Sequence, residues 1–189
     1  MLREPTPGHR GYADVLFQAW RGQPVVGEIT PAYALLSAAT FAEMAGLGRD
    51  VRFVFVMRDP VARLISAVRM NARRRHAWLG DALRGKMLKR SRYDLTIRQL
   101  EAAVPREQIA YFFYESLFRR AEVDRLCDFL GVSHRPARFK RRVHAAVGTA
   151  DTLDRELEAR AMEALVPAYD FVRKRFGELV PATWRKVGA

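Results

Sequence analysis

The stretch from Val51 to Ser66 constrains the fold most, because it contains a strand, a turn and a helix in immediate succession. Its first seven residues are mostly β-branched or aromatic, and the run is too short and too continuous for an amphipathic helix, so it predicts a buried strand. Arg58 follows at the carboxyl end of this strand. Asp59 is a good helix N-cap, Pro60 suits the first helical position, and apolar residues then recur at helical spacing.

Arg58 stands where an open parallel α/β sheet binds its ligands. Ligands of such sheets lie outside the carboxyl ends of the strands, where helix N-termini favour anions. The sequence therefore predicts that this cation faces a phosphate group. The alternative interpretation is that Arg58 pairs with a carboxylate such as Asp59, and that Ser66 is an ordinary helical serine.

The spacing of Arg58, Pro60 and Ser66 resembles the 3′-phosphate-binding element of sulfotransferases that use 3′-phosphoadenosine 5′-phosphosulfate (PAPS). In that family the arginine and the serine hold the 3′-phosphate, so the resemblance implies these roles for Arg58 and Ser66. It also implies an α/β fold like that of P-loop NTPases, with a three-layer arrangement of a parallel sheet and helices on both faces. The donor would be PAPS, with no metal.

A second segment, Gly27 to Tyr33, resembles the Gly-Glu-Lys-Thr-Pro-Xaa-Tyr element of family members that act on carbohydrates and related acceptors. The resemblance implies that Glu28 takes the proton from the acceptor. A carboxylate at the end of a brief buried strand, Val25–Gly27, would be partly desolvated, which raises its pKa towards that of a useful base. The alternative is that Glu28 only caps the helix expected over residues 31–45. Ile29 replaces the family's lysine, which leaves the small-molecule or carbohydrate acceptor undefined.

Two further segments extend the resemblance towards the C-terminus. Residues 105–117 predict a turn, a strand over Ile109–Phe113 and a helix near Ser116 that Glu115 caps, and the next helix ends at a glycine. The last segment is an amphipathic helical run from Thr152, with a kink or break at Pro167. We therefore expect parallel strands near residues 25–27, 52–57 and 109–113.

The family's phosphate contacts are only partly matched. A loop before the closing helices supplies basic groups to the donor in the family, which makes Arg142 and His144 candidate equivalents. Nothing between Met1 and Val25 resembles the family's opening strand and Lys/Ser-Gly-Thr-Thr loop, which hold the 5′-phosphosulfate. Residues 1–189 are thus expected to form one partial sulfotransferase domain. Its 52–57 strand would have a free edge that favours association, and it would bind donor weakly and transfer slowly.

Composition limits the other functions. The 33 basic and 21 acidic residues give a formal charge of +12, which attracts polyanions including the nucleotide donor. No zinc-finger spacing, RNP-like motif or basic zipper accompanies this charge, so a solvated basic face is the simpler interpretation.

The single cysteine, Cys127, excludes an internal disulfide and fits a buried structural thiol. No apolar run approaches the roughly 20 residues of a membrane span, and no signal peptide is visible, which predicts a cytoplasmic protein.

The leading hypothesis is transfer of a sulfonate group from PAPS to a hydroxyl or an amine. Glu28 is the candidate base, Arg58 and Ser66 bind the donor, and positioning with charge neutralisation supplies most of the rate. Two alternatives stay open. One is a non-catalytic homologue that binds the nucleotide, and the other is a basic domain associated with nucleic acid.

Overall fold

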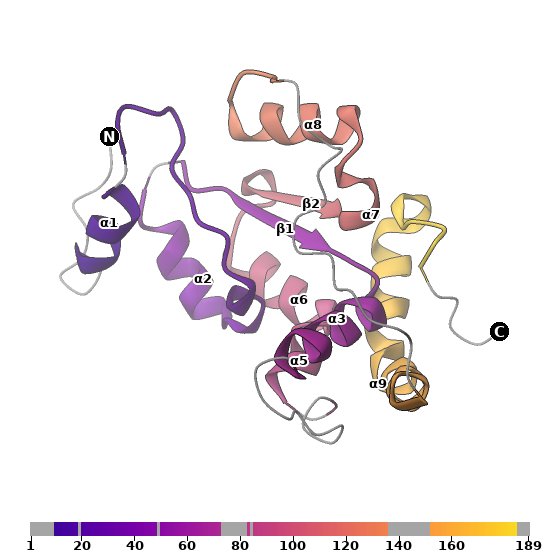
Figure 1. Ribbon diagram of the computed structural model, residues 1–189. Helices are drawn as coiled ribbons and strands as arrows, with labels where there is room; N and C mark the ends of the chain where they lie inside the picture. Colours follow the sequence, from indigo (N-terminus) through magenta and orange to yellow (C-terminus); the bar gives the residue numbers. More distant parts are fainter. Residues whose placement is uncertain are drawn as a thin grey trace.

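The computed structural model describes residues 10–18, 20–48, 50–72, 83, 85–135 and 152–184. The elements that it defines are shown in Figure 1 and follow in chain order: α1 (Arg10–Phe17), η1 (Pro31–Leu35), α2 (Ala38–Ala45), β1 (Phe53–Met57), α3 (Pro60–Ala72), α5 (Lys86–Lys89), α6 (Tyr93–Ala103), η2 (Arg106–Gln108), β2 (Ile109–Phe113), α7 (Tyr114–Leu117), α8 (Arg120–Leu130), α9 (Thr152–Phe176) and η3 (Gly177–Leu179).

The sheet of the described residues consists of β1 and β2, which pair in parallel. The register runs from Phe53 opposite Ile109 to Met57 opposite Phe113, so the two strands end level with each other. Two of the three predicted strands, those near residues 52–57 and 109–113, are confirmed, and so is the α/β architecture with a parallel sheet. Because the two strands end at paired residues, the residues that follow Met57 and Phe113 lie next to each other at one edge of the sheet.

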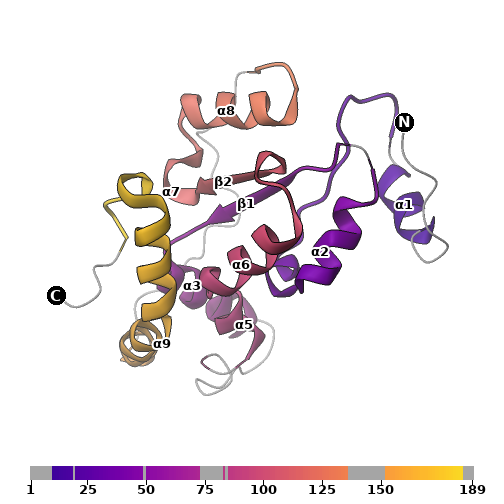
Figure 2. The same ribbon diagram turned by 180° about the vertical axis from the view of Figure 1, so that it is seen from behind.

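One face of the sheet packs against most of the helices. Phe55 of β1 contacts Tyr93 of α6 edge to face at 5.7 Å between ring centroids, and Met57 is fully buried. Helices α2, α3, α6 and α9 lie on this side of the strands in both views (Figures 1 and 2). Burying a large apolar side chain contributes about 1.5–3 kcal/mol, so this layer supplies most of the core's stability.

Among the described elements, α8 covers the other face of the sheet over β2. The guanidinium of Arg125 in α8 lies 3.8 Å from the centroid of the Phe112 ring and donates to the Tyr111 carbonyl at 2.9 Å. The predicted glycine stop of α8 is confirmed, since Gly131 has a φ of 68°. On β1, Val54 and Val56 stay 37% and 42% exposed on the same face.

Two predictions for the N-terminal part are wrong. Val25–Gly27 forms no strand, because Pro24 carries no donor and the segment pairs with no other described strand; Val25 is instead exposed. The helix expected over residues 31–45 is two elements, η1 and α2. The oxygen of Ser37 accepts a hydrogen bond from the Thr40 amide at 3.3 Å and begins α2 as its N-cap.

Pro167 does not end the C-terminal helix. Helix α9 continues through it from Thr152 to Phe176, and Figure 1 shows the helix changing direction along its length. Proline removes one helical hydrogen bond and crowds the preceding turn, which bends a helix without ending it when packing holds both halves. Cys127 is half-buried, less than expected. None of the described helices is long and apolar enough to cross a membrane.

Candidate functional site

The turn between β1 and α3 is fixed by hydrogen bonds from distant parts of the chain. Asp59 is the predicted N-cap: its Oδ1 accepts from the Ala62 amide at 2.8 Å. The Asp59 amide in turn donates to Oε1 of Glu115, which follows β2, at 3.0 Å. Glu115 thus links the two strand ends, and the prediction that it caps its own helix is wrong.

The hydroxyls of two buried tyrosines form hydrogen bonds with the backbone of the same turn. The hydroxyl of Tyr93 donates to the carbonyl of Arg58 at 2.8 Å, and burial raises the pKa of this phenol, which keeps it protonated as the donor. The hydroxyl of Tyr169 in α9 accepts from the Val61 amide at 3.4 Å. Hydrogen bonds to Tyr93 therefore fix the backbone of Arg58, whereas its side chain is only half-buried.

The side chain of Arg58 lies on an exposed aromatic pair. Its guanidinium carbon is 5.3 Å from the centroid of the Tyr114 ring, and Phe118 meets that ring edge to face at 5.3 Å. Tyr114 is 44% exposed and Phe118 is 54% exposed. Arg58 forms no ion pair with a carboxylate of the described residues, so the pairing considered in the sequence is absent there. A half-buried guanidinium whose donors bind none of the described residues can bind an anion.

Ser66 lies on α3, seven residues after the N-cap Asp59. Two helical turns span about seven residues, so the serine and the strand-end turn share one face of α3. Its half-buried side chain is the second group expected at a phosphate. The intervening Arg63 instead turns away towards α5, where its Nε donates to Ser91 Oγ at 2.6 Å.

Glu28 lies in a separate cluster. The hydroxyls of Tyr12 and Tyr33 both donate to its Oε1, the first at 2.7 Å. Burial, together with the hydrogen bond and the charge of Glu28, raises the pKa of Tyr12 to about 12. The carboxylate itself is exposed, so the expected desolvation at a strand end is wrong. Within the described ranges the hydrogen-bond partners of Glu28, Tyr12 and Tyr33, are different from the aromatic partner of Arg58, Tyr114.

A match to a known family accompanies this geometry. A sequence model of the sulfotransferase family matches residues 9–136. The chain belongs to this family. A search of curated proteins found no match. Among solved structures, a sulfotransferase from Alicyclobacillus acidocaldarius superimposes with a TM-score of 0.61 at 20% identity, over 92% of this chain and 78% of that chain. At this identity the likeness establishes the fold.

The sequence reasoning missed one residue of the site, Tyr114. The signal was present in the strands of this sulfotransferase-family chain: Arg58 follows Met57, Tyr114 follows Phe113, and these two strand ends are register partners. Side chains that follow paired parallel strands lie close together. Two other candidates, Arg142 and His144, lie outside the described residues.

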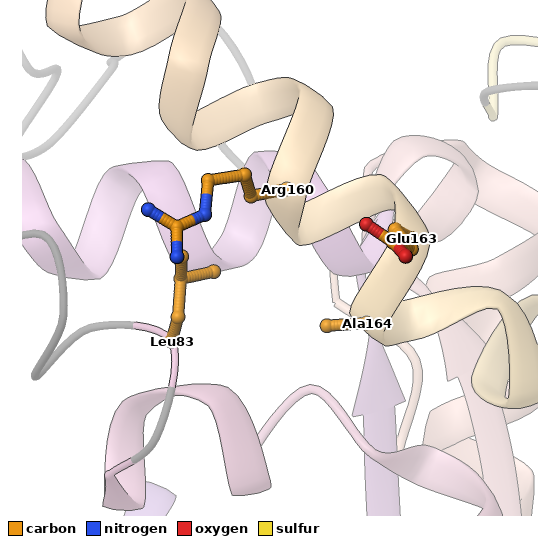
Figure 3. A pocket seen from close by; sticks show the side chains of 4 residues that line it. All are labelled: Leu83, Arg160, Glu163 and Ala164. Carbon is orange, nitrogen blue, oxygen red and sulfur yellow. The ribbon is translucent and has the colours of Figure 1, made fainter.

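The pocket of about 350 Å³ in Figure 3 lies beside α9, away from these clusters. The described residues that line it are Leu83, Arg160, Glu163 and Ala164. Arg160 extends from α9 towards Leu83 in this view, and it also pairs with Glu156 at 3.5 Å along the helix. Arg58, Ser66 and Glu28 are not among the described residues that line this pocket. The described residues contain no group of three or more side chains that could bind a metal ion.

Proposed function

We propose that this chain transfers a sulfonate group from PAPS to a hydroxyl or an amine of a small-molecule or carbohydrate acceptor. The family and the fold support sulfonate transfer in general. The observation that carries the finer proposal is the guanidinium of Arg58, which stands at the carboxyl end of β1, lies on Tyr114 and has no carboxylate partner among the described residues.

The residues at the strand ends suit the donor's 3′-phosphate. Arg58 offers several charge-assisted hydrogen bonds to phosphate oxygens, and Ser66 offers a hydroxyl on the same face of α3. The α3 amino end adds a partial positive charge nearby. When bound, PAPS supplies the activated sulfonate group. The exposed ring of Tyr114 gives the donor a flat apolar surface beside the phosphate.

Glu28 is the proposed proton acceptor. Its Oε1 is occupied by two tyrosine hydroxyls, whereas its Oε2 has no hydrogen bond to the described residues. We infer that Oε2 takes the proton of the acceptor, because the two phenols fix the orientation of the carboxylate. Exposure of Glu28 allows an acceptor to reach it.

We expect 3′-phosphoadenosine 5′-phosphate to bind more tightly than adenosine 5′-phosphate, since only the first has a 3′-phosphate for Arg58 and Ser66. One charge-assisted bond contributes about 1.5–3 kcal/mol, so Arg58→Ala should remove most of the difference. Calorimetry on both nucleotides measures this. Arg106→Ala is the matched control, because Arg106 also lies on a tyrosine ring, 5.2 Å from that of Tyr111. Equal affinities in the unmodified chain, or a difference that survives Arg58→Ala, would contradict the donor site.

The free edge of β1 predicts association of two copies. β1 is uncharged along its length, it pairs on one side only among the described strands, and Val56 is exposed. We expect sedimentation velocity to show concentration-dependent association in moderate salt, which screens the net charge. Val56→Lys should suppress it, whereas Val15→Lys, at an exposed position of α1, should not. An unchanged sedimentation profile for Val56→Lys would exclude this edge as the interface.

A further inference from the structure

Arg63 links α3 to α5 and is half-buried. Its Nε donates to Ser91 Oγ at 2.6 Å, and its Nη2 donates to the carbonyl of Met87. Ser91 is fully buried, and its hydroxyl donates to the Pro60 carbonyl at 2.9 Å. The guanidinium of Arg63 is thus fixed by two residues, Met87 and Ser91, that lie on either side of Arg90 in the chain.

Arg90 stands in this junction with one donor, its Nε, that lacks an acceptor among the described residues. Its Nε is buried and has no hydrogen-bond partner, although the rest of the side chain is only half-buried. Neither Arg63 nor Arg90 forms an ion pair with a described carboxylate. The partners of the Arg63 guanidinium, the Met87 carbonyl and Ser91, place it beside the chain segment that carries Arg90. Burial lowers the pKa of Arg63, Tyr93 opposes this, and the positive charge of Arg90 lowers it further, in keeping with that placement. Such a pair is unfavourable unless an anion joins it.

We propose that Arg63 and Arg90 form an oxyanion-binding site, separate from Arg58. An oxyanion would supply the missing acceptor for Arg90 Nε and offset the repulsion between the two guanidiniums. The two arginines extend towards different helices. Arg58 lies on Tyr114 of α7, whereas Arg63 donates to Ser91 next to α5. Figure 2 shows α7 and α5 on opposite sides of α3. The half-buried Arg90 keeps the site open to solvent.

A phosphate or sulfate of a nucleotide and an anionic group on an acceptor offer the same chemistry to this pair. If the anion is part of the acceptor, the acceptors of the proposed sulfonate transfer include negatively charged molecules, and this assignment rests on the proposed function. The existence of the anion site does not rest on that function, because its residues are distinct from Arg58, Ser66 and Glu28.

The test follows the Nε–H resonance of Arg90 by NMR in the ¹⁵N-labelled full chain, assigned by its loss in Arg90→Lys. Inorganic phosphate should shift this resonance downfield as the buried N–H gains an acceptor, and sodium chloride at equal ionic strength should not. In Arg90→Gln, the phosphate affinity measured from the Ser91 amide should fall by roughly tenfold or more. Lys89→Ala, which removes a neighbouring exposed cation, should leave that affinity unchanged.

Further titrations of the same resonance identify the molecule that supplies the anion. Arg58→Ala should retain the phosphate shift, whereas its loss in that variant would overturn a separate site. A shift of the Arg90 resonance by 3′-phosphoadenosine 5′-phosphate that persists in Arg58→Ala would identify the nucleotide as the source. A response to phosphate and acetate but not to this nucleotide would indicate the acceptor. No response to any of these anions, or an equal response to chloride, would overturn the proposal even if Arg58 binds nucleotide as proposed.

Discussion

Replacement of Glu28 by glutamine is expected to lower turnover by roughly 10²–10⁴-fold, the range over which a positioned general base contributes. The amide keeps the shape of the side chain, and its oxygen can still accept the hydroxyls of Tyr12 and Tyr33. What it cannot do is take the proton of the acceptor. Initial rates with labelled PAPS and a panel of hydroxyl and amine acceptors measure the effect.

Two controls separate this loss from general damage. Glu107→Gln changes an exposed glutamate at the amino end of β2 and should leave turnover unchanged. Glu28→Gln should keep the affinity for 3′-phosphoadenosine 5′-phosphate, because the hydrogen bonds of Glu28 to described residues go to Tyr12 and Tyr33 and not to Arg58, Ser66 or Tyr114. Full turnover by Glu28→Gln would assign the base to another residue. A chain that binds this nucleotide but transfers nothing would favour the non-catalytic alternative.

The part of the site that could be predicted from the sequence is the part that local physics determines. A short β-branched run, an aspartate N-cap and a proline at the first helical position specify β1, its turn and α3 within one stretch of chain. Arg58 is at the predicted strand end for that reason. Val25–Gly27 had the β-branched residues but no partner strand, and a strand depends on pairing as much as on composition.

The groups around Arg58 depend on contacts between segments distant in the chain. Glu115 looked like the cap of its own helix, yet its carboxylate accepts the amide of Asp59, 56 positions away. Arg63 follows Arg58 by five residues, but the position of α5 decides that Arg63 donates to Ser91. Neither arrangement follows from spacing, because spacing fixes the face of a helix and not the element that covers it.

Helix α9 connects this non-local packing to the site, and Leu165 is the clearest position to test it. Leu165 is fully buried, as is Tyr169 one turn later, whose hydroxyl reaches the amide of Val61 at the start of α3. The side of α9 that holds both residues packs on α3 and α6. Loss of this packing should therefore loosen the turn that presents Arg58.

Leu165→Ala is expected to lower the free energy of unfolding by about 2–5 kcal/mol, from the lost transfer energy and the cavity left behind. A domain of this kind has only about 5–15 kcal/mol in total, so the variant should unfold at a much lower urea concentration. Leu179→Ala makes the same change at a side chain that is 73% exposed, and should shift the free energy by about 0.5 kcal/mol or less. Equal urea midpoints for the two variants would show that α9 does not support the core, and the rigid placement of Arg58 would then need another origin.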